Sequence, residues 1–283
     1  MKFKMIVFFL IAFSFAMPAF AQKEFNAMTF NIRLDIASDS MNSWQYRKEN
    51  LASQILFHEV DILGIQEARE NQMQDLQSLL KGYEHVGIAR DTGRWGEYSA
   101  IFYKTSRFTL VEQNTFWLSE DIYASGKKGW DAAFPRIVTW AKLKDKRTKK
   151  VLYVFNTHFD HRGKIARRES AKLLLKQIDL IAGKLPVVVM GDFNASPSDE
   201  PIRIIEEKSN PLHLTDSRSL SASPPYGPTG TFNNWTHAEV SQEPIDYVFV
   251  KNGVRVLKHG TFSQTWNGRF SSDHFPVFVR VVL

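Results

Sequence analysis

The sequence predicts an α/β protein in which two β-sheets pack face to face and helices cover their outer sides. Strand-like runs rich in β-branched and aromatic residues recur along the chain and outnumber the helical segments. The helical segments fall between the early and middle strands, and each has an apolar face that a sheet must cover. Two packed sheets flanked by helices satisfy both observations.

The strand-like segments are short, apolar and bounded by turn residues. They span 25–32, 61–66, 98–103, 108–118, 137–143, 151–157, 185–190, 245–250, 254–262 and 275–283. Apolar residues spaced by three and four predict helices over 44–58, 72–80 and 164–182. We expect Ser43 to cap the first helix and Gly183 to end the last one. The basic stretch 142–150 lies between two strands, which favours a solvated hairpin turn over a nucleic-acid contact.

The N-terminus has the pattern of a secretory signal. Lys2 and Lys4 precede an apolar run over 5–20 that ends in Ala-Phe-Ala at 19–21, and polar residues follow at once. The run is short for a membrane span, so we expect cleavage after residue 21 and no stable membrane insertion. This predicts a signal peptide at 1–21, one domain over 22–283, and a secreted or periplasmic protein.

Composition narrows the class of protein. The chain has no cysteine, which excludes disulfides, thiolate metal sites and a lipid-modified N-terminal cysteine. The formal charge is +6, and removal of Lys2 and Lys4 leaves +4. This mild excess suits an anionic substrate without demanding a nucleic acid. The sequence has no internal repeat, and we expect a monomer in which the Ser/Pro-rich stretch 217–228 is a loop near the site.

Six polar clusters, each next to an apolar strand-like run, carry the functional prediction. They are TFNIR at 29–33, GIQE at 64–67, NTHFDH at 156–161, GDFN at 191–194, PIDYVFV at 244–250 and SSDHFPV at 271–277. Together they supply carboxylates, amides and histidines, the side chains that a hard divalent cation and a phosphate ester require. The clusters therefore predict a metal-dependent phosphoesterase.

In this order, the clusters resemble the endonuclease/exonuclease/phosphatase superfamily, which is DNase I-like and includes apurinic endonucleases, inositol polyphosphate 5-phosphatases and neutral sphingomyelinases. GDFN followed about eighty residues later by SDH is a specific pairing, and the resemblance runs from about residue 25 to 282. It implies the four-layer α/β sandwich of that superfamily, with two mixed sheets between layers of helices. It also implies an enzyme that hydrolyses phosphate esters.

The resemblance implies a site for Mg²⁺, with Mn²⁺ as the alternative. Glu67 is the expected principal ligand and Asn31 offers an amide oxygen beside it, while Asp273 contacts the metal or its ligands. Some members carry a second acidic ligand where this chain has Arg33, so we expect a single metal. Arg33 then either contacts phosphate or faces outward, the commoner fate of a strand arginine.

The resemblance also implies the catalytic set. Asp192 orients or deprotonates the attacking water, and Asn194 holds that water or the phosphate. We expect Gly191 to permit a tight turn before them. Asp246 pairs with His274, fixing its tautomer and raising its pKa, and His274 transfers a proton or stabilises charge on the phosphoryl oxygens.

Five further residues are expected at the substrate. The resemblance assigns His158 to the phosphate or leaving group, with Asn156 as support. His161 either faces the substrate or caps the following helix. Tyr98 and Arg136 fall in segments where branches of the superfamily differ, and they supply aromatic surface and a cation for the substrate.

We therefore expect a secreted hydrolase in which activated water attacks a phosphate ester in line, with a phosphodiester as the favoured substrate. The substrate is a phosphorylated small molecule or a nucleic acid. The alternatives are an extracellular endonuclease on DNA or RNA, a phosphomonoesterase of sugar or inositol phosphates, and a binding module without activity. A nuclease needs a long basic groove, which the scattered cations do not predict. The complete acid and histidine set argues against the binding module.

Overall fold

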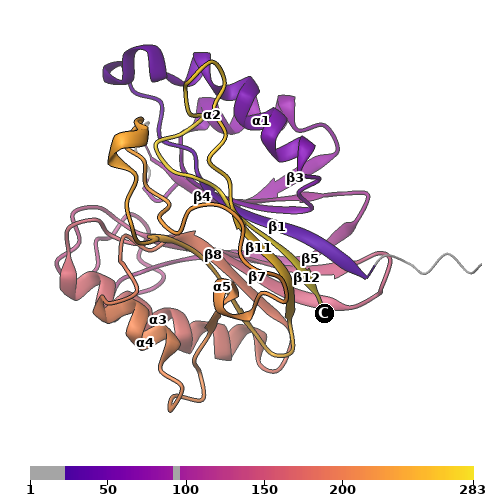
Figure 1. The fold of residues 1–283 in the computed structure, drawn as a ribbon. Helices are drawn as coiled ribbons and strands as arrows, with labels where there is room; N and C mark the ends of the chain where they lie inside the picture. The colour runs from indigo at the N-terminus through magenta and orange to yellow at the C-terminus, as the bar shows by residue number, and fades with distance from the viewer. Residues whose placement is uncertain (1–22, 92–95) are drawn as a thin grey trace, which may run out of the picture.

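The computed structural model describes residues 23–91 and 96–283, so the signal peptide predicted at 1–21 lies outside the described residues. Two six-stranded mixed sheets pack face to face, with helices on both outer sides (Figure 1). This is the predicted four-layer α/β sandwich. No helix within the described ranges is both long and apolar enough to cross a membrane.

The first sheet has the strand order β11-β12-β1-β2-β4-β3. Its strands are β11 (Arg255–Thr261), β12 (Val277–Val282), β1 (Glu24–Asn31), β2 (Ile62–Ala68), β4 (Tyr98–Lys104) and β3 (Tyr83–Val86). Only β1 and β2 run parallel among these neighbours. Helices α1 (Lys48–Phe57) and α2 (Glu70–Leu79) cover its outer face through an apolar layer that includes Leu51, Ile55 and Leu76.

The second sheet has the strand order β5-β6-β7-β8-β10-β9. Its strands are β5 (Phe108–Trp117), β6 (Ile137–Asp145), β7 (Val151–His158), β8 (Val187–Asp192), β10 (Asp246–Lys251) and β9 (Thr215–Asp216). Here β7 and β8 run parallel. Helices α3 (Lys164–Ala182) and α4 (Glu200–Glu206) cover its outer face, and the short α5 (Ser217–Leu220) follows β9.

The central core lies between the two sheets. Buried aliphatic side chains from both sheets meet there, among them Ala27, Ile101, Val154, Val188 and Val279. Strands that face this layer and also an outer helical layer are buried on both sides, which explains why their sequences read as continuous apolar runs.

Several sequence predictions agree closely with the structure. Helix α3 spans Lys164–Ala182 as predicted, and Gly183 ends it with a φ of 54°. Stretch 142–150 forms the β6–β7 hairpin. The turn is stabilised by the buried carboxylate of Asp145, which accepts the Arg147 N–H at 2.8 Å and pairs with Arg107 at 2.9 Å.

The predicted helix over 44–58 is interrupted. A 3₁₀ turn (Trp44–Tyr46) comes first, and α1 begins only at Lys48, because Arg47 has a non-helical backbone and a side chain directed into the protein. Ser43 makes no side-chain cap; its hydroxyl bonds to the Ser40 carbonyl. The sequence prediction also missed short elements that lack a full apolar period, namely β3, β9, α4, α5 and the 3₁₀ turns Ala37–Asn42 and His237–Glu239.

Candidate active site

Strand register places three site residues side by side at one edge of the second sheet. His158 at the end of β7 is the partner of Asp192 on β8, and Asp192 is the partner of Asp246 on β10. Because β10 is antiparallel to β8, its first residue meets the last residues of the other two strands. Asn31 and Glu67 reach the same edge from the parallel strands β1 and β2 of the first sheet.

Glu67 has an unusual backbone conformation. Its φ is 64°, in the left-handed region, at the point where the register between β2 and β4 shifts. The shift lets Gln66 bond within the protein interior while Glu67 lines the cleft. Such strain costs on the order of 1–3 kcal/mol and tends to occur at functional sites. Arg33 and Asn194, which also line the cleft, have φ values of 57° and 47°.

Asp192 lies at the centre of the polar cluster and is only 1% exposed. Its carboxylate accepts hydrogen bonds from the Asn31 amide at 2.9 Å and from the Asn194 backbone N–H at 2.8 Å. Nε2 of His158 and Nε2 of His274 lie 3.5 and 3.9 Å from its Oδ2. Burial, and then the charge of Asp246, raise the pKa of Asp192 to about 7. A carboxylate with that pKa is suited to accept a proton near neutral pH.

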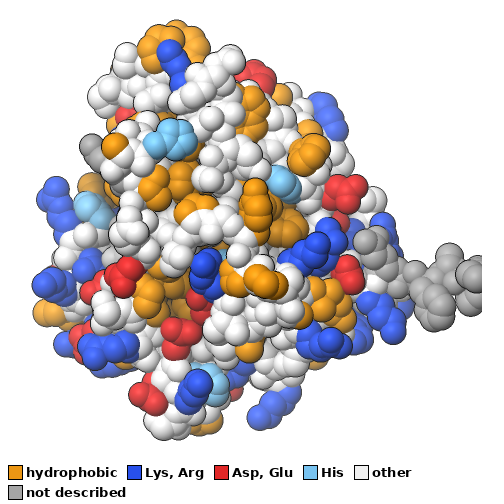
Figure 2. Space-filling view, viewed as in Figure 1, with side chains coloured by type: hydrophobic (Ala, Val, Ile, Leu, Met, Phe, Trp, Pro, Cys, Tyr) orange, Lys and Arg blue, Asp and Glu red, His pale blue; other side chains and the backbone are white. Residues whose placement is uncertain are grey.

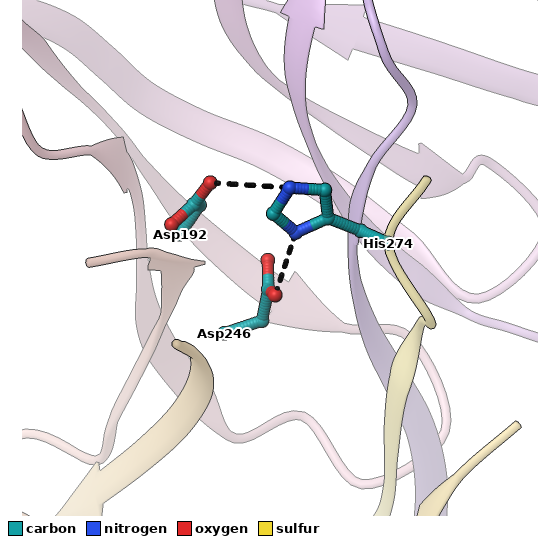
Figure 3. Close-up of side chains that lie close together, drawn as sticks. All are labelled: Asp192, Asp246 and His274. Atoms are coloured by element: carbon teal, nitrogen blue, oxygen red, sulfur yellow. Dashed lines mark hydrogen bonds and ion pairs between the residues drawn. The ribbon is translucent and has the colours of Figure 1, made fainter. Parts of the chain in front are cut away.

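His274 lies between two carboxylates (Figure 3). Its Nδ1 is 2.8 Å from Oδ2 of Asp246. Burial disfavours the charged ring, but Asp246, Asp192 and Asp273 outweigh it and hold the pKa of His274 well above its usual value. His274 is therefore an imidazolium whose Nδ1 donates to Asp246, while its Nε2 forms a longer ion pair with Asp192. This is the Asp246–His274 pairing that the resemblance implied.

His158, unlike His274, is neutral. Burial, followed by the nearby Arg136 and Arg90, lowers its pKa well below the usual value. The ring is neutral, so its Nε2 accepts from the Asn194 amide at 3.0 Å. The same amide group also donates to the Phe159 carbonyl. Two buried histidines with pKa values shifted in opposite directions are typical of a site that moves protons.

The acidic residues fit a divalent cation. Glu67, Asp192, Asp246 and Asp273 surround the His274 imidazolium, and Arg33 and Arg47 are the other nearby cations. Arg33 is also paired with Asp39, so carboxylates still outnumber cations at this site. Ligand atoms of Asp192, Asp246 and His274 lie within 4.8 Å of one another, a spacing compatible with a metal. A protonated His274 has no lone pair for a metal, however, which leaves Glu67 and Asp273 as the better ligands.

Asn31 connects two of these carboxylates. Its amide nitrogen donates to Oε1 of Glu67 at 3.0 Å and to Oδ2 of Asp192 at 2.9 Å, while its oxygen accepts the Arg33 N–H. Burial opposes ionisation of Glu67, but the Asn31 amide, His274 and a backbone N–H keep its pKa below the usual value. In this arrangement Asn31 orients the carboxylates; its predicted role as an oxygen ligand stays a prediction.

Arg33 does not face outward. Its Nε and Nη2 donate to the Asp39 carboxylate at 3.0 Å each, and its Nη1 lies 3.7 Å from Asp273. The guanidinium thus lies at the cleft between two carboxylates.

Arg136 and His161 both line the cleft. Nη2 of Arg136 lies 3.1 Å from Nδ1 of His161, and Nε of Arg136 lies 3.2 Å from Asp160. Of the two interpretations left open for His161, the structure shows the cleft-facing one, since the N-cap position of α3 is Gly163.

Asn156 does not line the cleft. It is fully buried between the sheets, where its amide donates at 2.8 Å to the carbonyls of Ile65 and Ala100 and its oxygen accepts from Gln66. A Cβ on Gly64 would lie 2.8 Å from this oxygen. This position contradicts the predicted substrate role. The Asn156 side chain lies between the two sheets and faces the first sheet, so it does not reach the cleft at the end of β7.

Two more expectations differ from the structure. The Tyr98 hydroxyl donates to Glu70, and its side chain borders a small internal space beside the cleft instead of offering aromatic surface to the substrate as predicted. Gly191 lies inside β8 and not in a turn. Glycine is needed there because a Cβ would lie 2.3 Å from the Thr157 carbonyl oxygen of β7.

The cleft has a volume of about 670 Å³. Sequence reasoning missed several of its lining residues, which come from loops without a motif: Asp39, Arg90, Phe134, Phe232 and Asn234. The Ser/Pro-rich stretch 217–228 was expected near the site, but the segment after it, with Phe232 and Trp235, is what reaches the cleft. Tyr226 instead bridges to Gly260 of β11.

Comparisons with known proteins show the family and the fold. The sequence model of the Endonuclease/Exonuclease/phosphatase family matches residues 28–274. A solved endonuclease/exonuclease/phosphatase of Bacteroides vulgatus is 39% identical, with a TM-score of 0.86, over 92% of this chain and 99% of that chain. A mannosyl-6-phosphatase of Bacteroides thetaiotaomicron is 35% identical, with a TM-score of 0.84, over 92% of this chain and 100% of that chain.

More distant curated relatives are larger proteins. Protein angel of Drosophila melanogaster is 26% identical over 179 residues, which are 61% of this chain and 50% of that protein. Nocturnin of the same species is 26% identical over 289 residues, 83% of this chain and 41% of that protein. The chain thus spans about half or less of their length. From the family match and the shared fold, the chain belongs to the endonuclease/exonuclease/phosphatase family, whose members are hydrolases of phosphate esters that generally use a divalent metal.

Proposed function

We propose that the protein is a secreted, Mg²⁺-dependent phosphoesterase that hydrolyses a small phosphorylated sugar. One observation carries the proposal: the buried carboxylate of Asp192 lies between a neutral His158 and a protonated His274. This places a proton acceptor for the attacking water next to a cation that can stabilise charge on the phosphoryl oxygens, an arrangement suited to hydrolysis of a phosphate ester.

We assign each side chain of the site a separate role in the reaction. Asp192 accepts a proton from the attacking water, and the Asn31 amide and the Asn194 N–H hold its carboxylate in place. His274, held by Asp246, donates from Nε2 and stabilises the charge that develops on the phosphoryl oxygens. His158, held in place by the Asn194 amide, lines the same cleft and orients the ester for in-line attack.

Glu67 and Asp273, with Asn31 beside them, would hold the cation. When bound, Mg²⁺ or Mn²⁺ neutralises phosphoryl charge and supports the leaving oxygen. The surplus of buried carboxylate charge is the feature of this chain that supports a cation there.

A small substrate is favoured over a nucleic acid. The cleft volume of about 670 Å³ falls in the usual range of small-molecule sites, roughly 300–1,000 Å³. On the face shown in Figure 2, Lys and Arg side chains are dispersed among acidic ones and form no continuous basic track. The 35% identical relative is named a mannosyl-6-phosphatase, so we propose a sugar phosphomonoester in place of the phosphodiester favoured by sequence analysis.

Secretion and the monomeric state are also proposals. The basic and apolar pattern over residues 1–21 supports export. N-terminal sequencing of the protein recovered outside the cytoplasm tests it, with Gln22 as the expected first residue. Light scattering of the purified protein tests the monomer.

The function is tested by incubating residues 22–283 with mannose 6-phosphate and with the methyl diester of the same sugar phosphate. We expect Mg²⁺-dependent phosphate release from the monoester that ceases with a chelator and in Asp192→Ala. Preference for the diester would return the assignment to a phosphodiesterase. No turnover of either ester by folded, Mg²⁺-loaded protein would contradict the proposed function.

A further inference from the structure

Five residues form a continuous surface along one side of the cleft, which we call the recognition wall: Arg90, Glu97, Phe134, Arg136 and His161. Each contacts the next. Oε1 of Glu97 lies 2.7 Å from Nη2 of Arg90, and the Arg90 guanidinium lies 4.9 Å from the centre of the Phe134 ring. Phe134 stacks on His161 at 5.8 Å, and Nδ1 of His161 lies 3.1 Å from Nη2 of Arg136.

The wall contains two donors without a partner. Nε of Arg90 and Nη1 of Arg136 have no hydrogen-bond acceptor within residues 23–91 and 96–283. The two residues are only 7% and 4% exposed. A buried donor that lacks a partner costs about 1–3 kcal/mol and calls for an explanation. Both arginines line the cleft together with His158, and all three also border the small internal space beside it.

The wall also offers an acceptor and an apolar surface. Glu97 is a cleft carboxylate whose second oxygen is not used by Arg90. Phe134 is 45% exposed although it lies in a cleft. Donors, an acceptor and an aromatic edge match a sugar, whose hydroxyls both donate and accept and whose C–H groups are apolar.

Asp160 holds this wall in place. One carboxylate oxygen accepts the backbone N–H groups of Ala133 and Phe134 and the Nε of Arg136. The other accepts the N–H groups of Arg162 and Gly163, at 2.9 and 2.7 Å. The wall is therefore fixed before any substrate arrives, which reduces the entropy lost on binding.

From these contacts we propose that the recognition wall binds the sugar ring of the substrate and decides which phosphomonoesters are hydrolysed. Glu97 accepts from a sugar hydroxyl, Arg90 and Arg136 donate to hydroxyl oxygens, and Phe134 packs against the C–H face. The proposal rests on the proposed function and adds the position and the residues that select the sugar.

The test compares mannose 6-phosphate with ethyl phosphate, a monoester that has no sugar to contact the wall. In Phe134→Ala and in Glu97→Gln we expect kcat/KM for mannose 6-phosphate to fall about 10- to 100-fold. The value for ethyl phosphate should hardly change, and Phe134→Tyr should restore sugar phosphate turnover. Tyr123→Ala is the matched control, because Tyr123 is an exposed aromatic residue outside the cleft.

Each other outcome is informative. Equal losses on both esters would overturn the proposal, since the wall would then serve the phosphate, and so would unchanged values on both. A nucleoside monophosphate hydrolysed faster than any hexose phosphate would also overturn it. If wild-type protein turns over no ester, the proposed function fails; calorimetry of mannose 6-phosphate binding to wild type and Phe134→Ala then tests the wall separately, and equal affinity would overturn it.

Discussion

Nδ1 of His274 lies 2.8 Å from Oδ2 of Asp246, although the two residues belong to segments that lead into different sheets. Asp246 begins β10 in the second sheet, whereas His274 precedes β12 in the first. The pair thus forms only when the two sheets are packed. It directs the Nε2 of His274 towards Asp192.

Asp246→Asn should therefore inactivate the enzyme without unfolding it. The neutral amide no longer holds the proton on His274, and we expect kcat to fall by about 10²- to 10⁴-fold. The free energy of unfolding in urea should not fall, because a buried negative charge beside Asp192 has been removed. Asp216→Asn is the control, since Asp216 is a carboxylate in the same sheet that does not line the cleft. Full kcat in Asp246→Asn would contradict this role for the pair.

Glu67→Gln should weaken cation binding. The variant keeps the shape of the side chain but removes its charge, and we expect affinity for Mn²⁺ or Mg²⁺ to fall by at least about 10-fold. Calorimetric titration of the metal into apoprotein measures this without relying on activity. Glu112→Gln, on an exposed part of β5, should bind like wild type. An unchanged affinity in Glu67→Gln would show that the cation binds elsewhere.

Asn156→Ala should destabilise the protein rather than weaken substrate binding. It removes two donors from buried backbone carbonyls and one acceptor from Gln66. We expect the free energy of unfolding to fall by about 3 kcal/mol. KM of the folded fraction should stay close to that of wild type; a large rise in KM with unchanged stability would restore the substrate role predicted from sequence.

Arg47 is a buried cation that bonds to the two segments that follow Asn31 and precede Asp273. Its guanidinium lies 5.1 Å from the Trp44 ring and 5.3 Å from the Trp235 ring, and it donates to the carbonyls of Ile32 and Ser271. Arg47→Met leaves these carbonyls without a donor, so we expect the free energy of unfolding to fall by about 2–4 kcal/mol. The exposed Arg255→Met on β11 is the comparison in urea titrations. Equal stability of both variants would refute the role of Arg47.

His259 should make stability depend on pH. Burial, and then Arg218, lower the pKa of His259 from 6.5 to about 4. The unfolded chain therefore binds this proton more readily, so that its contribution to stability is complete above pH 6.5 and is lost as pH falls towards 4. The loss is about 3 kcal/mol.

His259→Gln removes that dependence. The difference in unfolding free energy between variant and wild type should move in favour of the variant as pH falls from 6.5 to 4. Both proteins retain Asp216, whose raised pKa acts in the opposite direction and cancels in the comparison. A difference that stays constant over this range would show that His259 is not buried in a neutral state.

Local sequence patterns were enough to predict the layers of the fold and most of the residues of the site. Apolar runs with strand and helix periods are local patterns, and α3 and most central strands were predicted from them within a few residues. The clusters around Asn31, Glu67, Asp192 and His274 end or follow such runs, so their meeting at one edge follows from sheet order and strand direction. Site residues that lie at the end of a strand could therefore be predicted from the local sequence.

The residues that surround that edge depend on how the two sheets and their loops pack. Asn156 was predicted at the substrate, yet it bonds between the sheets, and Arg47 and Arg90 have no motif that would place them at the site. Gly191 is required by a carbonyl of the neighbouring strand and not by a turn of its own segment. These roles depend on contacts between residues far apart in the chain, and such contacts are set by how the sheets pack rather than by any local pattern.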